Sequence, residues 1–109
     1  MARVVTFGEV MIRMCPPGFL RLSQSLPGSL DATFGGAEVN VAVSLAQQGH
    51  QAAFCTALPS NPLTTSFMQE LRKLGVETDL VQTSPEGRFG IYFVENGANQ
   101  RSSTVTYDR

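Results

Sequence analysis

The hydrophobic pattern alternates between runs typical of buried strands and runs typical of helices. Residues 4–10 form a short, apolar and largely β-branched run, which favours a parallel strand covered on both faces. Residues 38–48 are apolar nearly all around a helix, which predicts burial on most sides, and Gly49 is placed to end that helix as a left-handed cap. Residues 52–57 predict a second strand.

The next segment has the signals of an amphipathic helix. Asn61 can cap its start, Pro62 suits the first helical position, and Gly75 can end it. The apolar positions in between follow spacings of four, four and three: Leu63, Phe67, Leu71 and Leu74. Strand, helix, strand and helix in succession indicate a parallel α/β sheet.

Two stretches interrupt this order. Proline and glycine breakers at residues 15–18 and 26–28 make residues 14–34 an excursion with short strands. Residues 88–95 and 101–107 are rich in strand-forming residues, and the Asn-Gly step within residues 96–99 predicts that they form a hairpin.

The hairpin would gather two phenols and a guanidinium on one face. Unless a bulge intervenes, even-numbered residues of its first strand share a face with odd-numbered residues of its second. One face then holds Tyr92, Ser103, Val105, Tyr107 and Arg109, and the other holds Phe89, Ile91, Phe93, Thr104 and Thr106. Because a guanidinium matches a carboxylate, the first face is either a site for an acidic polar ligand or a solvated surface.

A glycine pair precedes the first helix. Gly35 and Gly36 would let the backbone approach a ligand, and the helix after them directs free N–H groups to the same place. The alternative is a tight strand-to-helix turn with no ligand. Asn40, one turn into the helix, is either a ligand contact or a helix-end hydrogen bond, whereas Glu38 complements the helix dipole rather than acting in catalysis.

Composition excludes several classes of function. A length of 109 residues with 42% hydrophobic content fits about one globular domain, and a net charge of −1 without charged runs argues against nucleic-acid or membrane partners. Cys15 and Cys55 belong to no metal or redox motif, and His50 has no partner for a triad. The first fourteen residues fit neither a signal peptide nor a membrane span, so we expect a cytoplasmic protein.

Six segments together resemble one family. In chain order they are VVTFGEVM at 4–11, FGGAEVNVAVSLAQQG at 34–49, TALP at 56–59, LRKLGV at 71–76, GIYF at 90–93 and YDR at 107–109. Over essentially all 109 residues the chain resembles the N-terminal part of the PfkB (ribokinase-like) carbohydrate kinases. Its GGAE-x-N-V-A motif and Tyr-Asp-Arg end most resemble the 2-keto-3-deoxygluconate kinases within that family. Pro59 and Thr64 stand where glycine is common or usual in the family.

The resemblance implies a fold and a set of substrate contacts. It implies a three-layer α/β fold around a parallel sheet, with residues 1–109 as the N-terminal portion of the kinase domain and a β-sheet lid whose strands lie within about 14–34 and 88–109. The residues implied to bind the sugar acid are Gly35, Gly36, Asn40, Tyr92, Tyr107 and Arg109. It also implies a homo-oligomer formed through the lid strands.

The implied activity is phosphorylation of 2-keto-3-deoxygluconate by ATP with Mg²⁺ in a complete enzyme. The family's Gly-Ala-Gly-Asp signature, which carries the catalytic base and the anion hole, belongs to its C-terminal part and is absent from these residues. We therefore assign no catalytic residue, no metal ligand and no bound cofactor here, and expect the chain alone to be inactive. The alternatives are a non-catalytic module that binds a sugar acid or dimerises, and a kinase for fructose or a nucleoside.

Overall fold

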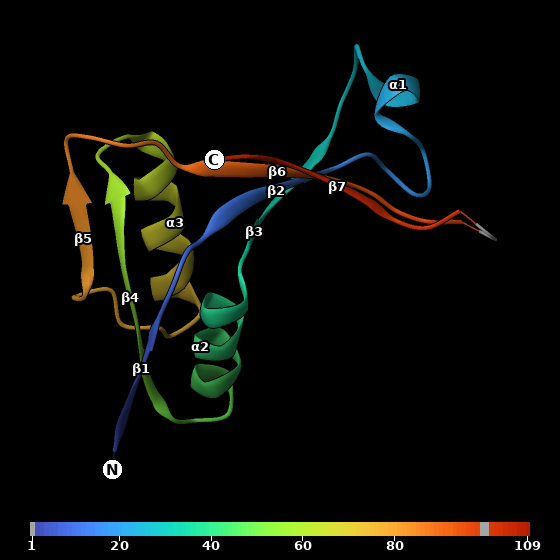
Figure 1. The fold of residues 1–109 in the computed structure, drawn as a ribbon. Helices are drawn as coiled ribbons and strands as arrows, with labels where there is room; N and C mark the ends of the chain where they lie inside the picture. Colours follow the sequence, from blue (N-terminus) through green and yellow to red (C-terminus); the bar gives the residue numbers. More distant parts are fainter. Residues whose placement is uncertain (1, 99–100) are drawn as a thin grey trace. The chain divides into compact units, whose positions relative to one another are not determined.

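The computed structural model describes residues 2–98 and 101–109, which fold as an α/β protein in two compact units (Figure 1). The elements in chain order are β1 (Arg3–Phe7), β2 (Met11–Cys15), α1 (Leu22–Ser25), β3 (Asp31–Gly35), α2 (Ala37–Gln47), β4 (Gln51–Pro59), α3 (Pro62–Lys73), β5 (Val81–Ser84), β6 (Gly90–Glu95) and β7 (Thr104–Asp108). The first unit comprises Met1–Val10 and Gly35–Phe89, and the second comprises Met11–Phe34 and Gly90–Arg109. No helix among the described residues could cross a membrane.

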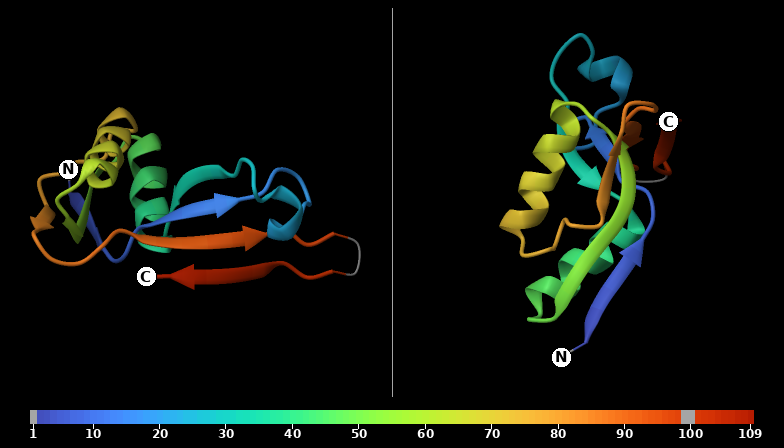
Figure 2. Two further views of the ribbon diagram at one scale, coloured as in Figure 1. Left: turned by 90° about the horizontal axis from the view of Figure 1, so that it is seen from above. Right: turned by 90° about the vertical axis from the view of Figure 1, so that its left-hand side faces the viewer.

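The first unit is built on a three-stranded parallel sheet with the order β1-β4-β5. Both crossovers advance in the same direction across the sheet, so the right-handed rule places α2 and α3 on one face, as Figure 2 shows. The core contains Phe67 of α3, whose ring meets those of Phe54 of β4 and Phe89 edge to face, with centroids 6.0 Å apart in both contacts. The parallel pairing of β1 with β4 and of β4 with β5 confirms the predicted parallel sheet.

Helix α3 forms where the sequence predicts it. The side-chain oxygen of Asn61 accepts hydrogen bonds from the N–H groups of Leu63 (2.9 Å) and Thr64 (3.2 Å), and Pro62 is the first helical residue. Gly75 follows the helix with a φ of 87°, the left-handed conformation expected after a helix end. Both predicted ends are confirmed.

Burial of β1 and α2 is less than their composition predicts. Val5 is 48% exposed and Phe7 is 77% exposed, so the described residues leave the side chains of β1 partly uncovered. In α2 only Val39 and Ala42 are buried, and Val41 is 50% exposed. The predictions of a strand covered on both faces and a helix buried on most sides are therefore wrong for the described residues.

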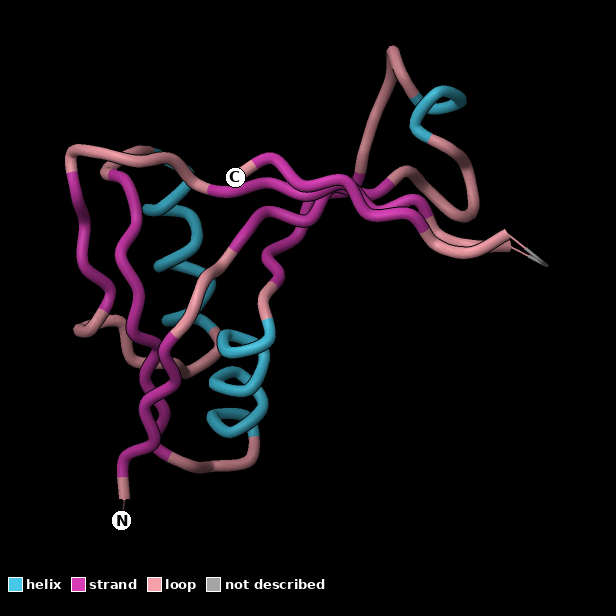
Figure 3. Tube along the Cα trace, viewed as in Figure 1, coloured by secondary structure: helices cyan, strands magenta, loops and turns pink. Residues whose placement is uncertain are grey.

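The second unit contains a mixed sheet with the order β3-β2-β6-β7 (Figure 3). Strands β2 and β6 are parallel, whereas β6 and β7 form the predicted antiparallel hairpin. Ala98 and Arg101 form a further antiparallel pair in the same register, so Ala98, which was predicted to belong to the loop, is paired across the hairpin. Asn99, at one end of the predicted loop, lies outside the described residues.

The excursion at residues 14–34 differs in part from the prediction. Its first strand, β2, begins earlier, at Met11, and a short helix, α1, occupies a place where only short strands were expected. The N–H of Leu22 at the start of α1 donates to the Glu95 carboxylate of β6 at 2.8 Å. The Arg21 N–H donates to the Gln24 side chain, also at 2.8 Å. The first bond joins residues 73 positions apart, which a local pattern does not reveal.

Candidate functional site

The turn at Gly36 requires glycine for a reason internal to the first unit. Gly36 has φ 151° and ψ 138°, a region that residues with a Cβ rarely adopt. A Cβ added there would lie 2.5 Å from the Glu9 carbonyl oxygen and 3.4 Å from the Val39 side chain. Close packing against Glu9 therefore explains this glycine without any ligand, which is the tight-turn alternative considered for the sequence.

The same turn opens helix α2, whose first N–H groups are available to a ligand. Asn40 donates its backbone N–H to the Gly36 carbonyl oxygen at 3.0 Å, and this bond closes the first helical turn. Helix geometry leaves the N–H groups of residues 37–39 without a partner inside the helix. These groups and the positive end of the helix dipole can hold an oxygen atom or an anion.

Two side chains of α2 frame this end of the helix. Glu38 lies in the first turn, as predicted, and its carboxylate carbon lies 2.5 Å from where a Cβ of Gly8 would be. The Glu38 side chain therefore packs over Gly8. Asn40 is exposed, and its side-chain amide forms no hydrogen bond to any of the described residues. Among these described residues, the side chain of Asn40 therefore does not form the helix-end bond considered as an alternative.

The face predicted from the hairpin parity is present in the second unit. Tyr92 pairs directly with Tyr107, and Phe93 pairs with Thr106 on the opposite face. The Tyr92 and Tyr107 rings lie with their centroids 5.9 Å apart and their planes tilted by 34°. The Arg109 guanidinium carbon lies 5.1 Å from the centroid of the Tyr107 ring, within cation–π distance. The structure thus brings these three predicted residues together.

Strand β2 adds a residue to this face that the sequence pattern did not indicate. Arg13 is the register partner of Tyr92 in the parallel pair β2-β6, so the two side chains share a face. The same strand pair places Met11 against Gly90. A Cβ on Gly90 would lie 2.9 Å from the Met11 side chain and 3.1 Å from the Arg109 Cβ, which locates Arg109 on this face as well. No local signal marks Arg13, because the pairing joins residues nearly eighty positions apart.

The six predicted site residues divide between the two units. Gly35, Gly36 and Asn40 belong to the first unit, where they lie at the start of α2. Tyr92, Tyr107 and Arg109 belong to the second unit, where they lie on one face of the hairpin. Each group of three is brought together within its own unit.

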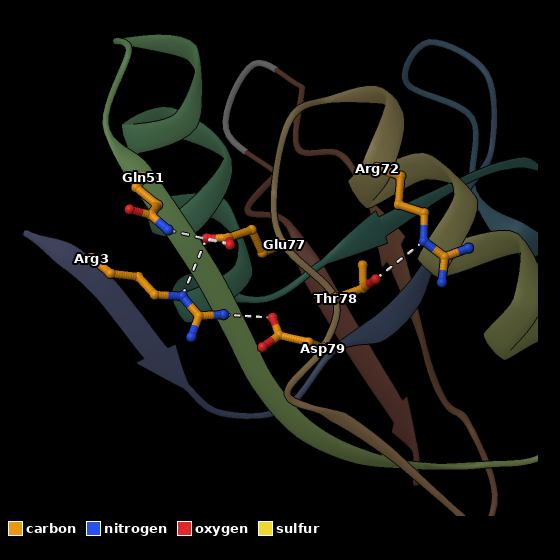
Figure 4. A network of polar contacts seen from close by, with 6 residues as sticks. All are labelled: Arg3, Gln51, Arg72, Glu77, Thr78 and Asp79. Carbon is orange, nitrogen blue, oxygen red and sulfur yellow. Dashed lines mark hydrogen bonds and ion pairs between the residues drawn. The ribbon is translucent and has the colours of Figure 1, made fainter. Parts of the chain in front are cut away.

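A polar network lies at the amino end of the first sheet, where β1 and β4 begin (Figure 4). Arg3 forms ion pairs with Glu77 at 3.2 Å and with Asp79, and Gln51 donates to Glu77 at 3.4 Å. Ligands of parallel sheets bind at the opposite, carboxyl ends of the strands. We therefore interpret this network as a structural link between β1, β4 and the segment before β5.

The chain is similar along its whole length to known carbohydrate kinases. It is 42% identical over 108 residues to the 2-dehydro-3-deoxygalactonokinase of Haloferax volcanii, in a match that covers 99% of this chain and 33% of the relative. It is 30% identical over 99 residues to the 2-dehydro-3-deoxygluconokinase of Dickeya dadantii, covering 87% of this chain and 29% of the relative.

A solved structure shows the same similarity in three dimensions. The fold matches the crystal structure of 2-dehydro-3-deoxygluconokinase from Thermotoga maritima with a TM-score of 0.93 and 51% sequence identity, covering 100% of this chain and 32% of that one. The chain thus spans about a third of the length of the relatives it matches. Residues 1–109 all match the pfkB family carbohydrate kinases, and the chain belongs to that family.

Proposed function

We propose that this chain is the sugar-binding part of an ATP-dependent kinase that phosphorylates 2-keto-3-deoxygluconate. The observation that carries the proposal is the face of Tyr92, Tyr107 and Arg109, which combines hydroxyl groups with a cation. Family membership supports a carbohydrate as the ligand, and the names of the relatives specify 2-dehydro-3-deoxy sugar acids. The gluconate form is the acceptor that we favour, and its galactonate epimer is the closest competitor.

Arg109 would bind the carboxylate of the substrate. A guanidinium presents a planar fork of donors that matches a carboxylate, and a hydrogen bond to a charged group stabilises a complex by roughly 1.5–3 kcal/mol. The Tyr107 ring beneath the guanidinium restricts the positions of Arg109 through the cation–π contact. The Tyr92 and Tyr107 hydroxyls, which form no hydrogen bond to any of the described residues, would bind hydroxyl or keto oxygens of the same ligand.

The glycine turn of the first unit holds the other predicted sugar contacts. The N–H groups of residues 37–39 point out of the start of α2 and can donate to sugar oxygens. Gly35 and Gly36 keep that approach free of side chains, and the unbonded amide of Asn40 is a further donor and acceptor. The strands within about 14–34 and 88–109 would act as a lid over the bound sugar.

The phosphoryl donor in the complete enzyme would be ATP with Mg²⁺, which supplies the transferred group and neutralises its charge. Among the described residues no three His, Cys, Asp or Glu side chains gather as metal ligands, and the sequence has no Walker A loop. We therefore assign neither nucleotide nor metal to these residues. The base that takes the proton from the sugar hydroxyl would come from residues beyond these 109.

A second candidate function is a non-catalytic module that binds a sugar acid or associates with a second copy. Strand β7 lies at the edge of its sheet and is exposed throughout, with Val105 at 44% and Tyr107 at 58%. An exposed edge strand can pair with another chain. We propose a homo-oligomer formed through these lid strands, which is compatible with either function.

The deciding experiment measures ATP-dependent phosphorylation by the longest natural polypeptide that carries these residues. The acceptors compared are 2-keto-3-deoxygluconate, its galactonate epimer, fructose and a nucleoside. We expect the gluconate acid to be the best acceptor. We also expect Arg109→Ala to raise the KM for that acid about 10- to 100-fold. This factor corresponds to the loss of one hydrogen bond to a charged group. Turnover of fructose or a nucleoside alone would overturn the acceptor assignment, and no kinase activity would favour the non-catalytic module.

A further inference from the structure

Arg13 occupies a central place on the face that carries the tyrosines. It is the register partner of Tyr92 on β6, and Tyr92 is in turn the partner of Tyr107 on β7. The three residues therefore form one row across three neighbouring strands, with all three side chains on the same face. The contact geometry at Gly90, which lies between Met11 and Arg109, supports this assignment independently.

The guanidinium of Arg13 lacks a protein partner among the described residues. Arg13 is half-buried, and its neighbours Met11 and Cys15 on the same face of β2 are buried. Its side chain forms no hydrogen bond or ion pair with any residue of the ranges 2–98 and 101–109. A guanidinium carries five N–H donors and stays charged, so the donors of Arg13 remain available to an acceptor that arrives from solution.

The charges on strands β2, β6 and β7 indicate what kind of acceptor would fit their shared face. The carboxylates on strands β6 and β7, Glu95 and Asp108, lie on the opposite face, because they occupy positions of the other parity. Strand β2 contains no carboxylate. The tyrosine face therefore carries the cation Arg13 and, just after β7, the cation Arg109, and no acidic side chain of these three strands lies on it.

The two cations can approach one ligand. Adjacent strands lie about 4.8 Å apart, so the Arg13 backbone on β2 lies roughly 10 Å from that of Tyr107 on β7. Arg109 follows Tyr107 by two residues, and its guanidinium lies over the Tyr107 ring, within the row that includes Tyr92 and Arg13. Tyr92 stands between Arg13 and Tyr107 in this row, and the four lone-pair positions of one carboxylate can accept from two guanidiniums.

We propose that Arg13 is a further substrate-binding residue, which shares the substrate carboxylate with Arg109 and so selects a sugar acid over a neutral sugar. This inference rests on the proposed function, since it assumes that the tyrosine face binds an acid. It adds a specificity determinant on β2, a strand to which the sequence pattern assigned no ligand contact.

The test compares an acid with its neutral counterpart, using the same natural polypeptide. The probes are 2-keto-3-deoxygluconate and 3-deoxyfructose, in which a CH₂OH group replaces the carboxylate, and calorimetric titration gives both affinities. Arg13→Met keeps the length of the side chain but removes its charge, and Arg13→Lys keeps the charge without the planar fork. Lys73→Gln is the matched control, because it removes one positive charge from an exposed position on α3.

We expect Arg13→Met to weaken binding of the acid about 10- to 100-fold and to leave 3-deoxyfructose within about threefold of the wild-type affinity. Arg13→Lys should be intermediate, and Lys73→Gln should change neither probe. Far-ultraviolet circular dichroism of each variant would verify folding. Equal losses for both probes would assign Arg13 a structural role and overturn the proposal. Wild-type binding of the acid with no change in Arg13→Met would overturn it too, while leaving the proposed function intact. A wild-type protein that binds neither probe would contradict the proposed function itself.

Discussion

Replacing Gly36 by alanine tests whether the glycine turn before α2 is set by packing against Glu9 or only by backbone conformation. Gly36 has a φ of 151°, and Gly49, after the other end of the same helix, has a φ of 92°. Both positions disfavour residues with a Cβ, but only Gly36 is crowded. A Cβ there would lie 2.5 Å from the Glu9 carbonyl oxygen, whereas a Cβ on Gly49 would meet nothing within 4 Å. Gly49→Ala is therefore a matched control.

Two energetic costs contribute, and they can be separated because only one of them applies to both substitutions. A strained backbone conformation costs about 1–3 kcal/mol, and this term applies to both substitutions. Forcing an extra methyl group into a packed place costs about 1–3 kcal/mol more, and this term applies to Gly36→Ala alone, because its nearest neighbour is a backbone atom that a side-chain rotation cannot move away. We expect the free energy of unfolding to fall by about 2–6 kcal/mol for Gly36→Ala and by about 1–3 kcal/mol for Gly49→Ala.

Urea unfolding followed by circular dichroism measures both losses, and the comparison uses the shift in midpoint at constant slope. Both substitutions flank the same helix within one unit, so they report on the same unfolding transition. Equal losses for the two variants would refute the role of Glu9 and leave backbone conformation as the whole cause. A larger loss for Gly49→Ala would refute the geometry of the turn as well.

Two further predictions concern a helix cap and the exposed edge strand. Asn61→Ala should lower the free energy of unfolding by about 1 kcal/mol, because it removes the acceptor for two N–H groups at the start of α3. Urea unfolding measures this loss, and Asn61→Ser should retain most of the wild-type stability because serine is also a good cap. An unchanged stability of Asn61→Ala would contradict the capping role. If the lid strands form a dimer, Val105→Lys on β7 should shift the monomer–dimer equilibrium toward monomer, because a lysine on an edge strand opposes pairing. Sedimentation equilibrium measures this shift, and an unchanged distribution would exclude this part of β7 from the contact.

Features that depend on neighbouring residues were predictable from the sequence. The cap by Asn61, the first-position proline and the glycine after α3 each act within one turn of a helix, so local chemistry determines them. The hairpin parity is also local, because two strands joined by a short connection keep their alternation along the whole pair. For that reason the shared face of Tyr92 and Tyr107 follows from the sequence alone.

Features that depend on distant partners were not predictable in this way. Strand β5 has the sequence Val-Gln-Thr-Ser, whose two central polar residues hide its role, and it forms because β4 offers an edge for parallel pairing. The burial of β1 was overestimated because an apolar sequence shows only that burial of the strand is favourable. It does not show whether other elements cover the strand, and Phe7 is 77% exposed among the described residues. Composition therefore predicts a preference, and the neighbouring elements decide whether it is met.

The candidate site combines both kinds of information, which is why only half of its positive charge could be predicted from the sequence. Arg109 follows Tyr107 by two residues, so the hairpin alternation alone places it on the tyrosine face. Arg13 reaches that face only through the parallel register of β2 with β6, and parallel strands have no short turn that fixes their register. A single arginine beside two phenols fits many solvated surfaces. The second arginine, Arg13, is half-buried in the same row and has no protein partner among the described residues, so the face offers two cations to an anionic ligand. The parallel pairing of β2 with β6 is therefore the observation that most supports a sugar acid as the ligand.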